Sequence, residues 1–151
     1  MIKKLEHHQL EEAIKIHILF QLSYTVEAKL LGISKFPPLE RTIENYQKSD
    51  TTFYAFFEKN ALAGIIEIED LQTKITINSL VVNPECFRRG IGKELVNFVL
   101  NTTTSKPCIV ETGILNTPAN QLYKSLGFIE LKQWKTDMGI QKVQYKKYPI
   151  N

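Results

Sequence analysis

Long apolar runs are missing from this chain of 151 residues, as is any excess of cysteine or of charge of one sign. No segment approaches the ~18 consecutive apolar residues of a membrane span, and the basic start at Lys3 and Lys4 is not followed by a signal-peptide core. Cys86 and Cys108 do not form a Cys-x-x-Cys pair, which argues against a disulfide framework and favours a reducing compartment. We therefore expect a cytoplasmic protein without a membrane partner.

Charge and metal-ligand patterns exclude further classes of function. The 19 basic and 16 acidic residues give a net charge of +3, which tolerates an anionic ligand without indicating a nucleic-acid partner. Three lysines in residues 142–147 alternate with other side chains as on a strand edge, so we predict no nucleic-acid binding. His7, His8 and His17 lack a His-x-x-x-His spacing, and we predict no metal site.

The first half of the chain changes from helical to strand periodicity. Residues 1–5 are predicted as a short strand and residues 10–31 as an amphipathic helix that ends at Gly32, because apolar side chains recur at helical spacing. That helical row consists of Ile14, Ile18, Leu22 and Val26. A stiff turn containing Pro37 and Pro38 precedes a short helix predicted at 40–48. Aromatic and β-branched runs then predict an antiparallel meander of strands at 53–57, 62–68 and 74–82.

The second half alternates helices and strands. A helix from Gly90 to Leu100 is followed by a buried strand at 108–112, and this strand-helix-strand unit favours parallel pairing. Thr117 and Pro118 are predicted to cap and open the next helix, before a closing hairpin at 128–134 and 140–148. Without repeats or linkers, the pattern predicts one α/β domain over residues 1–151, a mixed sheet flanked by helices.

A basic stretch containing two glycines, Arg88-Arg89-Gly90-Ile91-Gly92-Lys93, lies between the third strand of the meander and the next helix. Glycine lets backbone N–H groups approach an anion, and a helix start adds free N–H donors. A P-loop would need other residues at Phe87 and Glu94, and a dinucleotide fingerprint would need glycine at Leu95, so both are excluded. Taken alone, the stretch fits a phosphate cradle or a simple helix start with surface arginines.

A second motif lies beyond the next strand, in the segment ETGILNTPANQLYKSLGF at residues 111–128. It contains the pattern N-x-x-A-x-x-L-Y-x-x-x-G-F, formed by Asn116, Ala119, Leu122, Tyr123, Gly127 and Phe128. With both motifs in this order, the chain resembles the GNAT superfamily of N-acetyltransferases over nearly its whole length. The family's cofactor loop has the form Q/R-x-x-G-x-G/A, from which Phe87 departs at the first position. The resemblance implies a mixed, mostly antiparallel sheet with a parallel strand pair splayed around the cofactor.

The resemblance also implies acetyl-CoA as the acyl donor. The family binds pantetheine along the backbone of its fourth strand and the pyrophosphate at the glycine-containing loop, while an asparagine of the second motif touches the pantetheine arm. The implied cofactor-binding residues are Leu80, Val81, Val82, Arg88, Arg89, Gly90, Ile91, Gly92, Lys93, Asn116 and Tyr123.

The implied activity is transfer of an acetyl group to a primary amine by direct attack in a ternary complex. Tyr123 is the expected general acid, since a phenol beside the sulfur can give a proton to the leaving thiolate. The family's glutamate base aligns with Thr76, which cannot serve. Glu67 and Glu69 are expected to face water, which leaves Glu111 as the preferred base.

The acceptor and the assembly stay open from the sequence. The family's acceptor pocket maps to Tyr24, Glu27, Phe36, Pro37, Pro38 and Trp134, a set that suits a small or peptidyl amine. A non-catalytic acyl-CoA-binding sensor or interaction module is the alternative, motivated by Thr76 and Phe87. A homodimer through the long first helix or the last strand is also left open.

Overall fold

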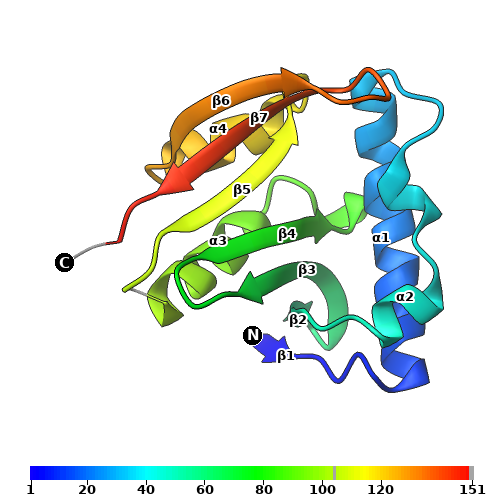
Figure 1. Cartoon of the computed structure of the whole chain (residues 1–151). Coiled ribbons are helices and arrows are strands. Elements are labelled where there is room, and N and C mark those ends of the chain that lie inside the picture. Colours follow the sequence, from blue (N-terminus) through cyan, green and yellow to red (C-terminus); the bar gives the residue numbers. More distant parts are fainter. Residues whose placement is uncertain (104, 150–151) are drawn as a thin grey trace.

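One seven-stranded sheet organises the chain, in the order β1-β2-β3-β4-β5-β7-β6 (Figure 1). The computed structural model describes residues 1–103 and 105–149; positions 104, 150 and 151 of the expected domain over 1–151 lie outside the described residues. The strands are β1 (Ile2–Lys4), β2 (Thr52–Glu58), β3 (Ala61–Asp70), β4 (Ile75–Val82), β5 (Cys108–Gly113), β6 (Ile129–Lys135) and β7 (Gln141–Lys147). The helices are α1 (Leu10–Leu31), α2 (Ile43–Gln47), α3 (Ile91–Thr102) and α4 (Thr117–Ser125), with 3₁₀ turns η1 (Pro37–Glu40) and η2 (Pro84–Cys86).

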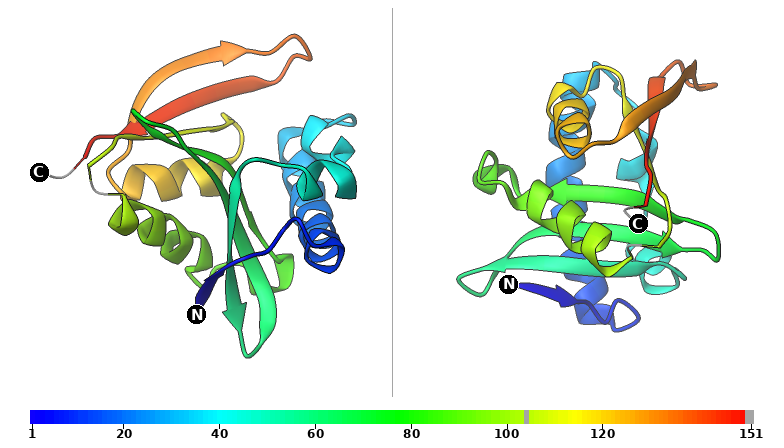
Figure 2. Two further views of the ribbon diagram at one scale, coloured as in Figure 1. Left: turned by 60° about the horizontal axis from the view of Figure 1, so that its bottom comes forward. Right: turned by 90° about the vertical axis from the view of Figure 1, so that its left-hand side faces the viewer.

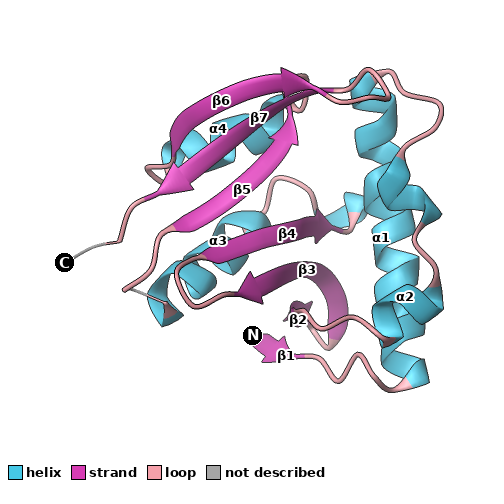
Figure 3. Cartoon of the chain, viewed as in Figure 1, coloured by secondary structure: helices cyan, strands magenta, loops and turns pink. Residues whose placement is uncertain are grey.

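The helices cover both faces of the sheet. Helices α1 and α2 lie on one side of the central strands and α3 and α4 on the other (Figures 2 and 3). One apolar core accordingly lies between the sheet and α3 and α4, and a second lies beneath α1. The middle of β3 is buried on both faces, so its six residues from Ala63 to Ile68 are all buried in succession.

The splayed parallel pair implied by the resemblance is confirmed. Strands β4 and β5 are parallel neighbours, but their pairing extends only over Ile75–Ile77 and Cys108–Val110. All other strand pairs are antiparallel. Beyond Ile77 the two strands diverge, and the second half of β4 has a sheet neighbour on one edge only.

Two predicted helix boundaries are wrong by a few residues, in each case because of a cap. The helix expected at 40–48 is two pieces, since the prolines form η1 and α2 begins only after Thr42. Thr42 and Asn45 make a reciprocal capping box, with side chain to backbone N–H contacts of 3.0 and 3.1 Å. The cap of α4 is Asn116, one residue before the predicted Thr117, and its Oδ1 accepts from the N–H of Ala119.

Helix α1 forms as predicted, but the apolar row that revealed it faces solvent. Ile14, Ile18, Leu22 and Val26 are exposed, while the buried face consists of Ala13, Ile16, Leu19, Phe20, Tyr24 and Ala28. Both faces of the helix are therefore apolar, and periodicity alone does not say which one meets the sheet. Within residues 1–103 and 105–149, no helix is long and apolar enough to cross a membrane.

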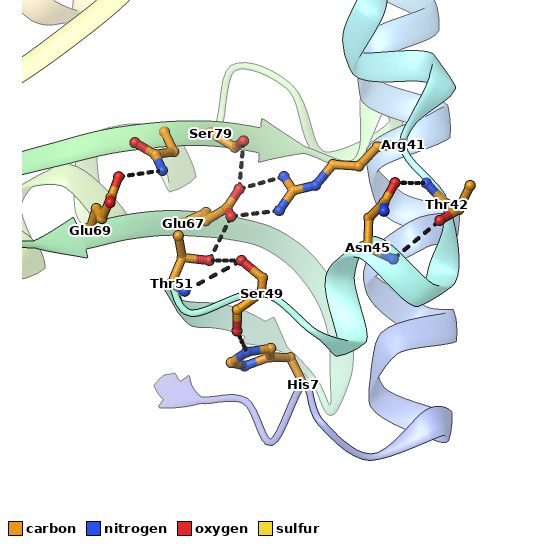
Figure 4. Close-up of polar contacts among 10 residues, drawn as sticks. His7, Arg41, Thr42, Asn45, Ser49, Thr51, Glu67, Glu69 and Ser79 are labelled. Atoms are coloured by element: carbon orange, nitrogen blue, oxygen red, sulfur yellow. Dashed lines mark hydrogen bonds and ion pairs between the residues drawn. The ribbon is translucent and has the colours of Figure 1, made fainter.

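The expectation that Glu67 faces water is wrong. The alternation of β3 directs Glu67 to the α1 side of the sheet, which is covered, and its side chain is 1% exposed. Arg41 donates two hydrogen bonds of 2.7 Å to the carboxylate, Thr51 donates one of 2.6 Å and Ser79 one of 2.9 Å (Figure 4). Glu69, by contrast, is exposed as expected.

These contacts fix the charge state of the buried pair. Burial opposes the charged form of Glu67, but the hydrogen bonds and the charge of Arg41 outweigh it and lower the pKa of the carboxyl. The Arg41 guanidinium also lies 4.4 Å from the ring centroid of Tyr46. The network therefore ties the segment between η1 and α2 to β3, and it leaves Glu67 no role as a proton acceptor at neutral pH.

Removing one partner of this pair should destabilise the protein strongly. Arg41→Met leaves the Glu67 charge buried without its counter-ion, and we expect a loss of about 3 to 5 kcal/mol in the free energy of unfolding. Lys48→Met is the matched control, because Lys48 pairs with Glu44 on the exposed surface and should change little. Urea unfolding measures both; equally small losses would contradict a structural role for the Arg41 pair.

Candidate active site

The open edge of β4 presents backbone groups to the gap beside β5. The N–H of Asn83 donates to Ala63 of β3, whereas the N–H of Val82 points to the Ser23 hydroxyl at 3.4 Å instead of to β3. Since successive residues of an edge strand address opposite sides, Leu80 shares the direction of Val82, and Val81 directs its backbone to β3. Leu80 and Val82 thus direct their backbone groups toward the gap, and Val81 supplies a buried core side chain.

The start of α3 carries a second set of donors. Gly90 is the left-handed N-cap, with φ of 77°, and the first helical bond runs from the N–H of Glu94 to the Gly90 carbonyl. The N–H groups of Ile91, Gly92 and Lys93 precede that bond and have no intrahelical acceptor. Because a helix start also carries the positive end of the helix dipole, this segment suits an anionic ligand.

The basic side chains of the loop differ in their surroundings. Arg88 has a positive φ of 66°, next to the extended Phe87, and Arg88 and Lys93 are exposed. The guanidinium of Arg89 pairs with Glu58 at the end of β2. Phe87 is 43% exposed. Arg88 and Lys93 are therefore available to an anion, while Arg89 would have to leave Glu58 to reach one.

A cavity of about 660 Å³ opens where β4 and β5 separate. An added Cβ on Gly92 would contact Leu80 and Leu122, and both side chains line this cavity. The start of α3 therefore borders the wall of the cavity. The residues that line it come from α1, η1, β4, β5, α4 and the β6–β7 turn, and they include Tyr24, Glu27, Phe36, Pro37, Pro38, Glu111, Asn116, Tyr123 and Lys142.

Three groups that line the cavity, Tyr24, Glu27 and Tyr123, have strongly raised pKa values. Tyr123 is 3% exposed, and burial, with the nearby Tyr24 and Glu27, raises the pKa of its phenol. Burial also raises the pKa of Glu27 to about 7, against a smaller opposing effect of the Lys142 charge and the Asn116 amide. At neutral pH the cavity therefore contains a phenol that stays protonated and a carboxyl near its midpoint, a pattern that marks candidate acid–base sites.

The remaining predicted residues are placed as follows. Asn116 is buried at the cap of α4 and lines the cavity, so one side chain both begins the helix and borders the site. Glu111 lines the same cavity from β5, at an exposed position, and its carboxylate accepts a 3.2 Å hydrogen bond from Gln144. Trp134 does not line the cavity; its ring lies under Lys132, with 5.3 Å from Nζ to the centroid.

A family model described as "Acetyltransferase (GNAT) domain" matches residues 23–149. The chain belongs to this family. The matched range includes both the glycine-containing loop at residues 88–93 and the motif from Asn116 to Phe128. The resemblance inferred from the sequence is therefore confirmed.

A curated relative extends beyond this chain. The UPF0157 protein YqkA of Bacillus subtilis is 31% identical over 150 residues, which are 99% of this chain but 44% of the relative. The chain thus spans less than half the length of that relative.

Solved structures share the whole fold at low identity. The PaiA N-acetyltransferase of Thermoplasma acidophilum, in complex with coenzyme A, has a TM-score of 0.75 and 21% identity, covering 97% of this chain and 98% of that one. The ribosomal-protein-S18-alanine N-acetyltransferase of Escherichia coli has a TM-score of 0.72 and 16% identity, covering 100% and 95%. At such identities these GNAT structures establish the fold alone.

Sequence reasoning placed Glu27 in the acceptor pocket but missed it as an acid–base group. Burial in the cavity raises the pKa of its carboxyl, and Lys142 and Asn116, far from it in the chain, only partly oppose that rise. Arg41 was missed altogether, although it lines the cavity and neutralises Glu67. A lone arginine after two prolines carries no sequence signal for such a pairing.

The raised pKa of Glu27 should be visible in stability. Between the ordinary glutamate value of 4.5 and about 7, the folded state holds a proton that the unfolded chain releases, so stability falls as pH rises through this window. Glu27→Gln removes this dependence. We expect the variant to gain about 1 to 2 kcal/mol relative to the wild type at pH 8 and little at pH 5. Urea unfolding at both pH values tests this; an equal difference at the two would refute it.

Proposed function

We propose that this chain is an acetyl-CoA-dependent N-acetyltransferase that moves an acetyl group to a primary amine by direct attack in a ternary complex. The observation that carries the proposal is the meeting, at one cavity, of an open β4 edge, a helix start with free donors, a protonated phenol and a carboxyl with a pKa near neutrality. Membership of the GNAT family supports the same conclusion. We place the activity in the cytoplasm, with no metal.

The residues present fit coenzyme A. Backbone groups of Leu80 and Val82 are oriented to pair with an amide-containing arm, and the N–H groups from Ile91 to Lys93 are oriented to bind a pyrophosphate. Arg88 and Lys93 would add charge, and Asn116, which lines the cavity, would border the arm. When bound, acetyl-CoA supplies an acetyl group activated as a thioester. A backbone N–H aimed at the thioester oxygen would stabilise developing charge, typically by ~3–4 kcal/mol.

Glu27 is our first candidate for the base. An amine is protonated at neutral pH and must lose a proton before it can attack, and a carboxyl with a pKa of about 7 can accept one without holding it too tightly. Its position on α1, among the aromatic and proline residues of the acceptor side, suits an incoming amine. Glu111, the base preferred from the sequence, is the second candidate.

Tyr123 is proposed as the acid that assists the leaving group. Its raised pKa keeps the phenol protonated, so it can donate a hydrogen bond to a departing sulfur. Because a thiol has a reference pKa of ~8.5, well below that of a phenol, complete proton transfer from Tyr123 is unfavourable. Stabilisation of the thiolate by a strong hydrogen bond is therefore the role that its environment supports.

The acceptor side of the cavity suits a small or peptidyl primary amine. Tyr24 and Phe36 pack edge to face at 5.7 Å between centroids, and Pro37 and Pro38 extend the apolar wall. Glu27 provides the anionic group that attracts an ammonium. The alternative, a non-catalytic acyl-CoA sensor on the same fold, is motivated by Phe87 in the loop, which lacks the polar side chain typical of the family.

The two candidate bases are separated by the pH dependence of turnover. With a panel of primary amines and short peptides, we expect wild-type thiol release to rise with pH through about 7, the pKa of the Glu27 carboxyl. Glu27→Gln should lower kcat/KM by about 10²- to 10⁴-fold and remove this rise. Glu111→Gln, the matched carboxyl-to-amide control on β5, should keep it.

Other outcomes of the same assay reassign the roles. Loss of the pH dependence in Glu111→Gln alone would make Glu111 the base. Tight acetyl-CoA binding with no thiol release on any amine, and no effect of Tyr123→Phe on the thermal shift that acetyl-CoA produces, would favour the sensor.

The cradle is tested at Gly90. Both Gly90 and Gly32 have a left-handed φ and open space around an added Cβ, so valine strains the backbone similarly at each. We expect Gly90→Val to raise the Kd of acetyl-CoA at least tenfold, because the α3 start must shift, and Gly32→Val to leave it unchanged. Isothermal titration calorimetry measures both. Equal acetyl-CoA affinities in the two variants would show that the loop is only a helix start, without a role in cofactor binding.

A further inference from the structure

The acceptor side of the cavity contains two opposite charges that are not paired with each other. Glu27 of α1 and Lys142 of β7 both line the cavity, and both side chains are only partly exposed. The ammonium is near enough to act on the carboxyl, because its charge lowers the pKa of Glu27 against the stronger effect of burial. Neither side chain forms an ion pair within the described part of the chain. The two groups are therefore free to bind a ligand that carries both an ammonium and an anionic group.

Local packing brings these two side chains to one end of the cavity. Lys142 is paired in register with Gly113, the last residue of β5. Gly113 lies against α1, since a Cβ added there would come within 2.7 Å of the Leu31 side chain. Glu27 precedes Leu31 by one helical turn, so both lie on the same face of α1. Contacts among α1, β5 and β7 thus place the Glu27 carboxylate and the Lys142 ammonium on the same part of the cavity wall.

Other charged groups of the cavity already have partners. The Arg41 guanidinium, the other cation that lines the cavity, donates both of its 2.7 Å hydrogen bonds to the buried Glu67 carboxylate. Glu111 accepts a hydrogen bond from Gln144. Among residues 1–103 and 105–149, Lys142 is therefore the cation of the cavity that has no carboxylate partner.

The anion that Lys142 would bind is not the pyrophosphate of the cofactor. Val143 and Tyr145 of β7 belong to the core beside α3 and α4, so by alternation Lys142 faces the α1 side of the sheet. The free N–H donors at the start of α3 lie on the opposite face (Figure 2). Lys142 thus belongs to the acceptor side of the site, together with Glu27.

We propose that the acceptor is a free amino acid with an apolar side chain, which directs its ammonium to Glu27 and its carboxylate to Lys142. Phe36, Pro37 and Ile140 supply apolar wall for the side chain. In a peptide the first carboxyl is consumed in an amide bond, so the same contact separates free amino acids from peptide N-termini. The inference rests on the proposed acyl transfer and narrows the class of its acceptor.

The bond changes leave the carboxylate untouched. The acceptor nitrogen bonds to the acetyl carbon as the carbon–sulfur bond of the thioester breaks. The ammonium loses two protons in all; one passes through Glu27 to solvent, and the other ends on the thiol of coenzyme A. The products are an N-acetylamino acid and coenzyme A. Lys142 therefore acts on binding and orientation, and not on the proton transfers.

Matched pairs of acid and amide test the role of Lys142. Phenylalanine with phenylalaninamide, and leucine with leucinamide, differ in the charge of one group. We measure the ratio of kcat/KM for the acid to that for the amide, in which the intrinsic reactivity of each amine is the same for every variant. Lys142→Met should lower this ratio about 10- to 100-fold, the usual size of a charge-assisted contact, and Lys142→Arg should retain most of it.

Lys146→Met is the matched control, because Lys146 lies on the same face of β7 but does not line the cavity. It should leave the ratio unchanged. Because the ratio compares two acceptors on one variant, it also cancels the change in the Glu27 pKa that removal of the Lys142 charge causes. A ratio that Lys142→Met leaves unchanged in both pairs would overturn the proposal.

Binding without turnover separates this inference from the proposed function. Calorimetric titration of phenylalanine or leucine into the protein saturated with coenzyme A should give a Kd that Lys142→Met raises at least about tenfold. If the acids bind in this way but no amine releases thiol, the acyl transfer fails and the carboxylate site stands. If amines are acetylated but neither acid binds with any dependence on Lys142, the acyl transfer stands and the carboxylate site is overturned.

Discussion

The early divergence of β4 and β5 is the constraint on which the rest of this molecule depends. A parallel pair normally buries its backbone groups in a continuous ladder, but here three residue pairs are followed by an open edge. The unpaired N–H groups of Leu80 and Val82 need partners, and in the described chain Val82 has only a long contact with Ser23. A ligand with its own amides would satisfy this edge, so the proposed binding site depends on the same gap that weakens the sheet.

A divergent sheet needs support on both sides of the gap. On the β4 side, the buried Glu67 carboxylate joins β3, β4 and the segment after η1 through Ser79, Thr51 and Arg41. On the β5 side, Tyr145 of β7 donates to Asn120 of α4, and Asn120 in turn donates to backbone carbonyls at the end of β5. Each half of the site is thus held by a polar network of its own, so the gap stays open without a direct bond across it.

Much of this could be predicted from the sequence, because local signals and two ordered motifs determine it. Apolar periodicity and turn residues predicted the order of elements, and the glycines at 90 and 92 together with the motif from Asn116 to Phe128 predicted the family. The surroundings of individual side chains could be predicted less well from the sequence. Alternation placed Glu67 opposite Ile66 correctly, yet it could not say that the opposite face is covered too. The pKa of Glu27 depends on α1, α4 and β7 meeting at one point, and no local pattern encodes that meeting.

Helix α1 shows why an apolar period is not enough to orient an element. Its row at Ile14, Ile18, Leu22 and Val26 is more regular than the row that packs on the sheet, and by pattern alone it is the better candidate for the core. The sheet instead receives the face with Phe20, Tyr24 and the small Ala13 and Ala28, whose mixed sizes fit the twisted surface of β2–β4. The two faces of one helix therefore have different surroundings, because one packs on the sheet and borders the cavity while the other is exposed.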